Sequence, residues 1–376
     1  MPLLRNILWL TLAAWLAVGC ATTKVEPVAV TEVALPESKP FAVSSQTVDT
    51  NALLAVPPSA VARPPTPTNP PSPNLQSAIR NLQSPVAPST AWVPLANWCV
   101  ANNLGQPQKI GANQFAAATR GGALVVQAGS QVARWEGTQL WLGYAPRVSK
   151  GQALLHWLDI QKTLDPLLHR SAPAPKPGRV LVLDAGHGGA DSGTHGTARQ
   201  LEKHFTLDWA LRAEPLLRSN GWTVFLTRTV DQDVPLTNRL ALADRVGADL
   251  FLSLHFNGLA AQARHSGIET FCLTPAGMPS SVTRGYEDDP RQEFPNNAYD
   301  RENLQVAFRL HREVLTATRA ADGAVRRARF MGVLRGQRRP AVLIEGGFLS
   351  NPEEARRIST AAYRQKLAEA LARALP

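Results

Sequence analysis

The C-terminal half of the chain alternates apolar runs with amphipathic segments. Runs that predict buried strands lie at residues 179–184, 222–227, 249–254, 267–273, 330–334 and 341–344. Segments with apolar positions at helical spacing lie at residues 202–219, 235–246, 300–319 and 360–375. This alternation predicts an α/β fold with a mixed, mostly parallel twisted sheet and helices on both faces.

Residues 91–171 have a different pattern, which predicts a small α+β domain. Residues 95–104 have helical spacing, and short alternating runs separated by glycine-containing turns at 121–122, 129–130 and 136–137 predict hairpins. Residues 154–168 predict one or two closing helices. Its histidines, His156 and His169, have no third ligand with them, so we expect both to be ordinary structural residues. We interpret the region as a positioning domain. A proline-rich linker at 172–178 follows it.

The first ninety residues predict export and a tether. Arg5 precedes an apolar run of twelve residues, which is too short to span a bilayer and is typical of a signal peptide over residues 1–20. The run ends in Ala-Val-Gly before Cys20, which resembles the lipobox of bacterial lipoproteins and implies a lipid anchor; a conventional cleaved signal is the alternative. Residues 21–90 hold 13 of the 30 prolines and no periodicity, so they predict a disordered tether.

Charge and cysteine content narrow the function classes. The formal net charge of +10 suits a nucleic acid, a phospholipid or an acidic wall polymer, or is a solvated basic surface. The predicted export disfavours a nucleic acid as the binding partner. The three cysteines exclude a disulfide scaffold, and we expect Cys99 and Cys272 to be unpaired buried thiols.

Three polar residues follow predicted strands at the edge where α/β sheets collect their active groups. They are His187, His255 and Glu345, and Glu202 opens the first helix of this region. Two histidines and one carboxylate form the ligand set of a catalytic zinc, which leaves a position for water. The other carboxylate is then available as a general base. Asn257, two residues after His255, is a candidate for orienting one of the metal-binding side chains without contacting the metal itself.

The motifs around these residues resemble those of the zinc-dependent N-acetylmuramoyl-L-alanine amidases. The similarity covers nearly all of residues 179–375 and rests on LDAGHGG (183–189), LE (201–202), LTR (226–228), SLHFN (253–257), SGIE (266–269) and PAVLIEGGFLSNP (340–352). It implies that His187, Glu202 and His255 bind zinc and that Glu345 is the catalytic glutamate. It also implies hydrolysis of the amide between muramic acid and the L-alanine of the stem peptide of peptidoglycan.

The resemblance leaves several assignments open. Arg228 either binds a substrate carboxylate or forms a buried ion pair, and His204, where the family often has an acidic residue, is expected to face solvent. Residues 275–303 form an insertion that either gates the substrate groove, with a protein activator, or is an exposed loop. The region 91–171 weakly resembles the copper-amine-oxidase-like N-terminal domains found beside wall hydrolases.

Two other functions remain open: a non-catalytic peptidoglycan-binding lipoprotein, and a zinc carboxypeptidase or endopeptidase acting on stem peptides. In each case we expect a periplasmic protein of the cell envelope. No aspartate follows Cys20, which favours an anchor in the outer membrane.

Overall fold

The computed structural model describes residues 91–170, 178–196, 198–258 and 264–376. The predicted signal peptide, the tether of residues 21–90 and nearly all of the 172–178 linker lie outside the described residues.

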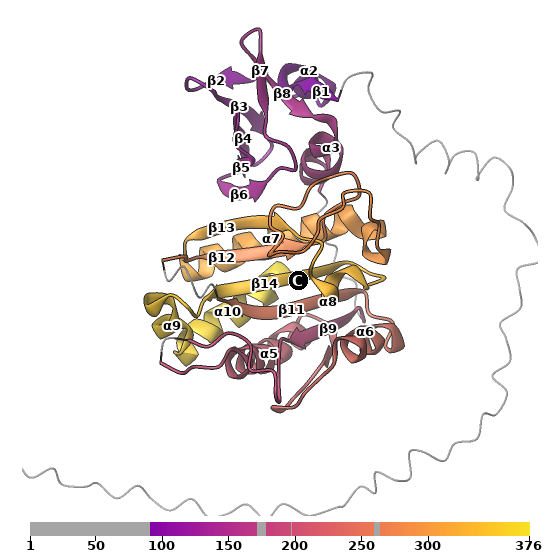
Figure 1. The fold of residues 1–376 in the computed structure, drawn as a ribbon, viewed down its shortest axis with the longest axis vertical. Helices are drawn as coiled ribbons and strands as arrows, with labels where there is room; N and C mark the ends of the chain where they lie inside the picture. Colours follow the sequence, from indigo (N-terminus) through magenta and orange to yellow (C-terminus); the bar gives the residue numbers. More distant parts are fainter. Residues whose placement is uncertain (1–90, 171–177, 197, 259–263) are drawn as a thin grey trace, which may run out of the picture. The chain divides into compact units, whose positions relative to one another are not determined.

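A parallel sheet forms the centre of the C-terminal region (Figure 1). Its strands are β10 (Thr223–Leu226), β9 (Val180–Ala185), β11 (Leu250–Asn257) and β14 (Ala341–Phe348), in that order. Beyond β14 the direction reverses, because β12 (Ile268–Cys272) runs antiparallel to it and β13 (Asp322–Arg327) runs parallel to β12. The predicted mixed, mostly parallel sheet is confirmed.

Helices cover both faces of this sheet, as predicted. One face packs against α5 (Glu202–Ser219), α7 (Asp300–Thr318) and α10 (Ala361–Ala374), and the other against α6 (Leu236–Arg245) and α8 (Gly332–Arg335). The pleat of β9 separates the two cores, since Leu181 and Leu183 belong to the first cluster and Val182 to the second. Two shorter helices complete the region, η3 (Pro295–Tyr299) and α9 (Pro352–Ile358).

Residues 91–170 form short strands and helices of their own. After β1 (Trp92–Pro94) and α2 (Leu95–Ala101), an antiparallel series contains β2 (Gln108–Lys109), β3 (Gln114–Thr119), β4 (Gly122–Gln127), β5 (Val132–Trp135) and β6 (Thr138–Trp141). A separate three-stranded sheet contains β1, β8 (Gln152–His156) and β7 (Arg147–Ser149). The helical segment that follows comprises α3 (Trp157–Asp159), η2 (Ile160–Leu164) and α4 (Asp165–Leu168). The three predicted hairpin turns are confirmed.

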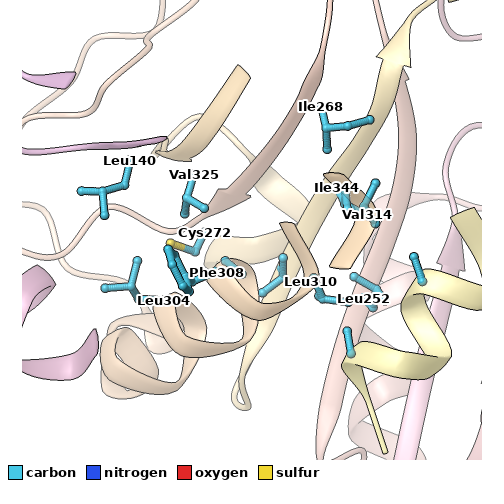
Figure 2. Packing of buried hydrophobic residues seen from close by; sticks show 14 of the residues in the cluster. Leu140, Leu252, Ile268, Cys272, Leu304, Phe308, Leu310, Val314, Val325 and Ile344 are labelled. Carbon is cyan, nitrogen blue, oxygen red and sulfur yellow. The ribbon is translucent and has the colours of Figure 1, made fainter. Parts of the chain in front are cut away.

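Strand β6 joins this region to the main sheet. Leu140 in β6 lies opposite Val325 in β13, and the two strands run parallel. Figure 2 shows both side chains in the packed cluster that also contains Leu304 and Phe308 of α7. The small region and the C-terminal region therefore share one core.

One predicted strand and the start of one predicted helix were wrong. Residues 330–334 contain the start of α8 rather than a strand, and the strand of this part of the chain is β13. A short apolar run fits a buried helical turn as well as a strand, and Leu334 is fully buried as part of α8. The predicted closing helix begins three residues late, because residues 154–156 belong to β8.

Cys99 and Cys272 are both buried, and no disulfide joins them, as expected from the sequence. Within the described part of the chain, no helix has the length and apolar character that crossing a membrane requires.

Candidate metal site and catalytic carboxylate

The sheet and one helix bring the three predicted metal ligands together. His187 follows β9, His255 lies near the carboxyl end of the adjacent parallel strand β11, and Glu202 is the first residue of α5. One possible ligand atom from each of the three side chains lies within 4.8 Å of the others. The two imidazole rings are nearly perpendicular, at 81°, with centroids 4.8 Å apart. This convergence is what the sequence predicted for the carboxyl edge of the sheet.

Glu202 is held in place by backbone donors. Its Oε1 accepts a hydrogen bond from the Phe256 amide at 2.9 Å, and its Oε2 accepts one from the Thr194 amide at 2.8 Å. Oε1 also lies 3.2 Å from Nε2 of His187 and 2.9 Å from Nδ1 of His255. Burial raises the pKa of Glu202, but hydrogen bonds and charge interactions with the two histidines outweigh it and hold that pKa well below its ordinary value. The carboxylate is therefore ionised and ready to bind a cation.

His187 has a carboxylate behind it that the sequence analysis did not identify. Its Nδ1 lies 2.8 Å from Oδ2 of Asp191, so Nε2 is left to face Glu202. Burial lowers the pKa of His187, but the interactions with Glu202 and Asp191 outweigh it and raise the pKa to about 9. A carboxylate on the far nitrogen of a metal-binding histidine fixes the ring orientation and makes the ring a stronger donor. The GHGGADSG run carries the aspartate four residues after His187, the only signal that could have revealed it.

Gly186 is required by close packing at this site. A Cβ on this residue would lie 2.3 Å from Cε1 and 2.4 Å from Nε2 of His255, far inside van der Waals contact. The turn after β9 therefore passes directly over the imidazole, and only a residue without a side chain fits there.

Glu345 lies beside the three ligands with one oxygen unpaired. It occupies β14, where its register neighbours are His255 on β11 and Glu269 on β12. The residue is 5% exposed, and its Oε2 has no hydrogen-bond partner among the residues that the structure describes. Burial, followed by the charges of Glu202 and Glu269, raises the pKa of Glu345 well above its ordinary value, while the charge of Arg284 acts in the opposite direction. A buried, unpaired carboxyl oxygen next to a metal site is placed to accept a proton.

Asn257 contacts the carboxylate next to Glu345 rather than a metal ligand. Its Nδ2 donates to Oε2 of Glu269 at 2.7 Å, and its Oδ1 accepts from Nη2 of Arg284 at 2.7 Å. Arg326 forms an ion pair with Glu269 through the other carboxylate oxygen, Oε1. Glu269 lies in the SGIE motif and Arg284 in the insertion, but the sequence analysis gave neither residue a role, because neither follows a parallel strand of the predicted sheet.

Among the described residues, Arg228 forms no ion pair, and its guanidinium contacts the backbone instead. It is 1% exposed and donates to backbone carbonyls of Ala185, Gly186 and Lys203 at 3.0, 2.9 and 2.7 Å. It is not among the described residues that line the metal-site cavity. Its hydrogen bonds connect the end of β9 to the first turn of α5, and they thereby stabilise the backbone that carries His187 and Glu202.

His204 faces solvent, and His156 and His169 have structural contacts, as expected from the sequence. The side chain of His204 is 57% exposed and lies 3.7 Å from Asp231. His156 accepts from the amide of Leu158 and stacks on Tyr144, and His169 pairs with Asn102.

The three candidate metal ligands and Glu345 line a cavity of about 670 Å³. Its wall is completed by residues of α6, α8 and the insertion, among them Leu236, Val333 and Arg284. The donor set fits zinc, because two imidazoles and one carboxylate converge and the open side of the site faces the cavity. The arrangement can hold a metal ion and a water molecule beside a buried proton acceptor.

Comparisons with known proteins agree with this geometry. The model of the Amidase_3 family, described as N-acetylmuramoyl-L-alanine amidase, matches residues 181–376. The chain is 34% identical over 227 residues to N-acetylmuramoyl-L-alanine amidase AmiA of Escherichia coli K12, a match that covers 54% of this chain and 78% of that protein. It is 29% identical over 239 residues to N-acetylmuramoyl-L-alanine amidase AmiC of Escherichia coli O6:H1, which covers 57% of this chain and 56% of that protein.

Among solved structures, the chain is similar to the catalytic domain of CwlV, an N-acetylmuramoyl-L-alanine amidase from Bacillus (Paenibacillus) polymyxa. The identity is 29% and the TM-score is 0.44, and the match covers 52% of this chain and 96% of that chain.

Proposed function

The chain belongs to the Amidase_3 family of N-acetylmuramoyl-L-alanine amidases, and we propose that it cleaves peptidoglycan with His187, Glu202 and His255 as zinc ligands and Glu345 as the catalytic base. The scissile bond is the amide between N-acetylmuramic acid and the L-alanine of the stem peptide. The observation that carries this assignment is the convergence of the three ligands within 4.8 Å, beside the unpaired Oε2 of Glu345.

The residues of the chain divide the chemistry of amide hydrolysis between them. A zinc ion held by His187, Glu202 and His255 would polarise the scissile carbonyl and make a nearby water molecule more acidic. Glu345 accepts the proton of the attacking water at Oε2 and delivers it to the departing nitrogen of L-alanine. Asp191 holds the imidazole of His187 in orientation through Nδ1, so that Nε2 faces the site.

Amidases of this family act in the cell envelope, and the N-terminal sequence supports a more specific location for this chain. We infer that residues 1–20 direct export to the periplasm and that lipid on Cys20 anchors the protein in the outer membrane. The proline-rich residues 21–90 would then be a tether that lets the enzyme reach the wall. Metabolic labelling with a radioactive fatty acid tests the anchor: wild type is labelled and Cys20→Ala is not, whereas a labelled Cys20→Ala protein contradicts it.

Residues 91–171 are proposed as a positioning domain. The parallel pairing of β6 with β13 supports this role, because the small region is fixed to the catalytic sheet rather than connected to it only through the linker. Within residues 91–170, the part of this region that the structure describes, no cluster of three metal-binding side chains is found.

Mass spectrometry of digested sacculi tests the reaction. Wild-type enzyme is expected to release intact stem peptides that begin with alanine, and Glu345→Gln to release them about 100 to 10,000 times more slowly. Glu369→Gln, an exposed carboxylate on α10, is the matched control and keeps wild-type activity. Shortened stem peptides would indicate a carboxypeptidase or endopeptidase, and no soluble product would indicate a binding protein; either result contradicts the proposal.

A further inference from the structure

The insertion after β12 carries one arginine into the cavity of the metal site. Arg284 lines that cavity together with the metal ligands and Glu345. Its Nη2 donates to Oδ1 of Asn257 at 2.7 Å, and its Cζ lies 5.6 Å from the centroid of the Phe330 ring. The guanidinium is therefore held on two sides, by an amide oxygen and an aromatic ring, while the residue as a whole remains exposed.

The base of the loop that presents this arginine is firmly closed. We define the Arg284 loop as residues 280–288. Ser280 donates from its amide and its hydroxyl to Asp288 at 2.8 and 2.6 Å, so the two ends of the loop are joined. Arg329, whose side chain is fully buried, donates to Asp288 at 2.7 Å and to the carbonyl oxygens of Pro275 and Met278 at 2.8 and 2.5 Å. The loop is thus anchored by a buried ion pair rather than lying free on the surface.

The tip of the Arg284 loop is a tight turn that places an arginine where glycine or asparagine is usual. The amide of Tyr286 donates to the carbonyl of Thr283 at 2.9 Å, and both central residues have positive φ, 47° at Arg284 and 79° at Gly285. Positive φ is unfavourable for a residue with a Cβ, which approaches the following carbonyl oxygen, so the turn holds Arg284 in a strained backbone conformation. The turn directs the guanidinium back toward Asn257.

Among the described residues that line the cavity, Arg284 is the cation without a carboxylate partner. The other arginine of the lining, Arg239, forms an ion pair with Asp184 at 2.5 Å. Of the acidic residues in the lining, Glu202 belongs to the metal site and Asp191 contacts His187. None of the ion pairs formed among the described residues includes Arg284, so its positive charge is available to a bound molecule.

We propose that Arg284 forms a subsite that binds a carboxylate of the stem peptide and so selects substrates that carry that charge close to the scissile amide. This inference rests on the proposed function and extends it to substrate selection. An arginine fork matches a carboxylate with two parallel hydrogen bonds, a geometry that an amide in the same place does not reproduce. Asn257 and Phe330 hold the fork in position before the substrate arrives, which reduces the entropic cost of binding.

Two soluble muramyl peptides test the subsite, one with a free α-carboxylate on the second residue of the stem and one with a carboxamide there. Wild-type, zinc-loaded enzyme is expected to prefer the free carboxylate by about fivefold to tenfold in kcat/KM, chiefly through KM. Arg284→Gln is expected to remove this preference, because kcat/KM for the free carboxylate falls more than kcat/KM for the carboxamide, and Arg284→Lys restores part of the preference. Arg291→Gln, on an exposed arginine of the same insertion paired with Asp289, keeps the wild-type preference.

The outcomes separate this inference from the proposed function. Equal kcat/KM for the two substrates in the wild type overturns the subsite and leaves the amidase assignment intact. A preference that persists in Arg284→Gln, or an equal loss on both substrates, also overturns it, because the arginine would then act on the fold or on the chemistry in general. If the wild type cleaves neither substrate, the proposed function fails. Calorimetric binding of the two free stem peptides then still tests the subsite without turnover, and equal affinities overturn it.

Discussion

Replacement of Asp184 by alanine tests the buried support beneath the metal site. Asp184 is 1% exposed at the end of β9, and its carboxylate accepts from the hydroxyls of Thr227 and Ser253 at 2.8 and 2.6 Å. It also pairs with Nη1 of Arg239 at 2.5 Å. Arg239 in turn donates from Nη2 to the carbonyl of His187 at 2.9 Å. Loss of the carboxylate therefore affects both the core and the peptide that carries a metal ligand.

The loss of unfolding free energy expected for Asp184→Ala depends on the charge of Arg239, which stays buried in the variant. Arg239 keeps hydrogen bonds to the carbonyls of Val234, Ala185 and His187, but its positive charge loses its counterion in a site that is 7% exposed. Removal of one partner of a buried ion pair typically costs about 3 to 5 kcal/mol, because the remaining charge is not solvated. Since Arg239 keeps three carbonyl acceptors, we expect a value near the lower end, about 3 kcal/mol.

Urea unfolding of the zinc-free protein measures this cost, with Arg239→Met and the double variant completing the cycle. The double variant Asp184→Ala/Arg239→Met leaves no unpaired charge buried. Its loss of unfolding free energy is therefore expected to be smaller than the sum of the losses in the two single variants, by about 1 to 3 kcal/mol. Asp289→Ala, which breaks the exposed pair with Arg291, serves as a control and leaves the unfolding midpoint unchanged. A cost below about 1 kcal/mol for Asp184→Ala, or strict additivity in the cycle, would refute the reasoning.

Two further predictions concern packing at the site and the pH dependence of stability. Gly186→Ala is expected to displace the His255 imidazole, which the new Cβ would approach to 2.3 Å, and to lower zinc affinity at least tenfold in a competition titration. The control Gly105→Ala, whose Cβ would meet nothing within 4 Å, is expected to keep the wild-type affinity. Equal zinc affinities of Gly186→Ala and wild type would refute the packing argument. Burial raises the pKa of Asp159 to about 6 from 3.8, although the amides of Gly143 and Tyr144 donate to it. Because folding favours the protonated carboxyl, Asp159 contributes stability below pH 4 that is lost as the pH rises through 6, by about 3 kcal/mol. In urea unfolding, the free energy of unfolding of wild type relative to Asp159→Asn is therefore expected to fall by that amount over this pH range. A difference between the two proteins that does not change with pH would contradict the prediction.

The sequence predicted the parts of the fold that follow a regular period. The strands β9, β11 and β14 are long apolar runs, and the helices α5, α7 and α10 have apolar stripes, so the predicted ends of both lie within four residues of the observed ones. Strand β13 was missed because it includes the buried, charged Arg327, which donates to Thr163 and to the carbonyl of Lys162 in the small region. A partner distant in the sequence makes this arginine a core residue, and no local pattern reveals that.

Two of the candidate metal ligands could be predicted from the sequence, whereas the residues around them could not. His187 and His255 lie at the ends of parallel strands, and a rule about sheet edges is enough to bring them together. Glu269 reaches the site only because β12 runs antiparallel to β14, which places it opposite Glu345. Arg284 depends on the closure of its loop by Arg329, 45 residues further along the chain. Such contacts are properties of the tertiary structure.

Zinc content is the most direct measurement of the central claim that His187, Glu202 and His255 form one metal site. Purified wild-type protein dialysed against a zinc buffer is expected to hold one zinc ion per chain by atomic absorption, with hydrolysis of sacculi proportional to that content. His255→Ala is expected to lose both the metal and the activity, whereas His204→Ala, on an exposed histidine near the same turn of α5, keeps both. A His255→Ala protein that retains stoichiometric zinc and wild-type activity would contradict the account.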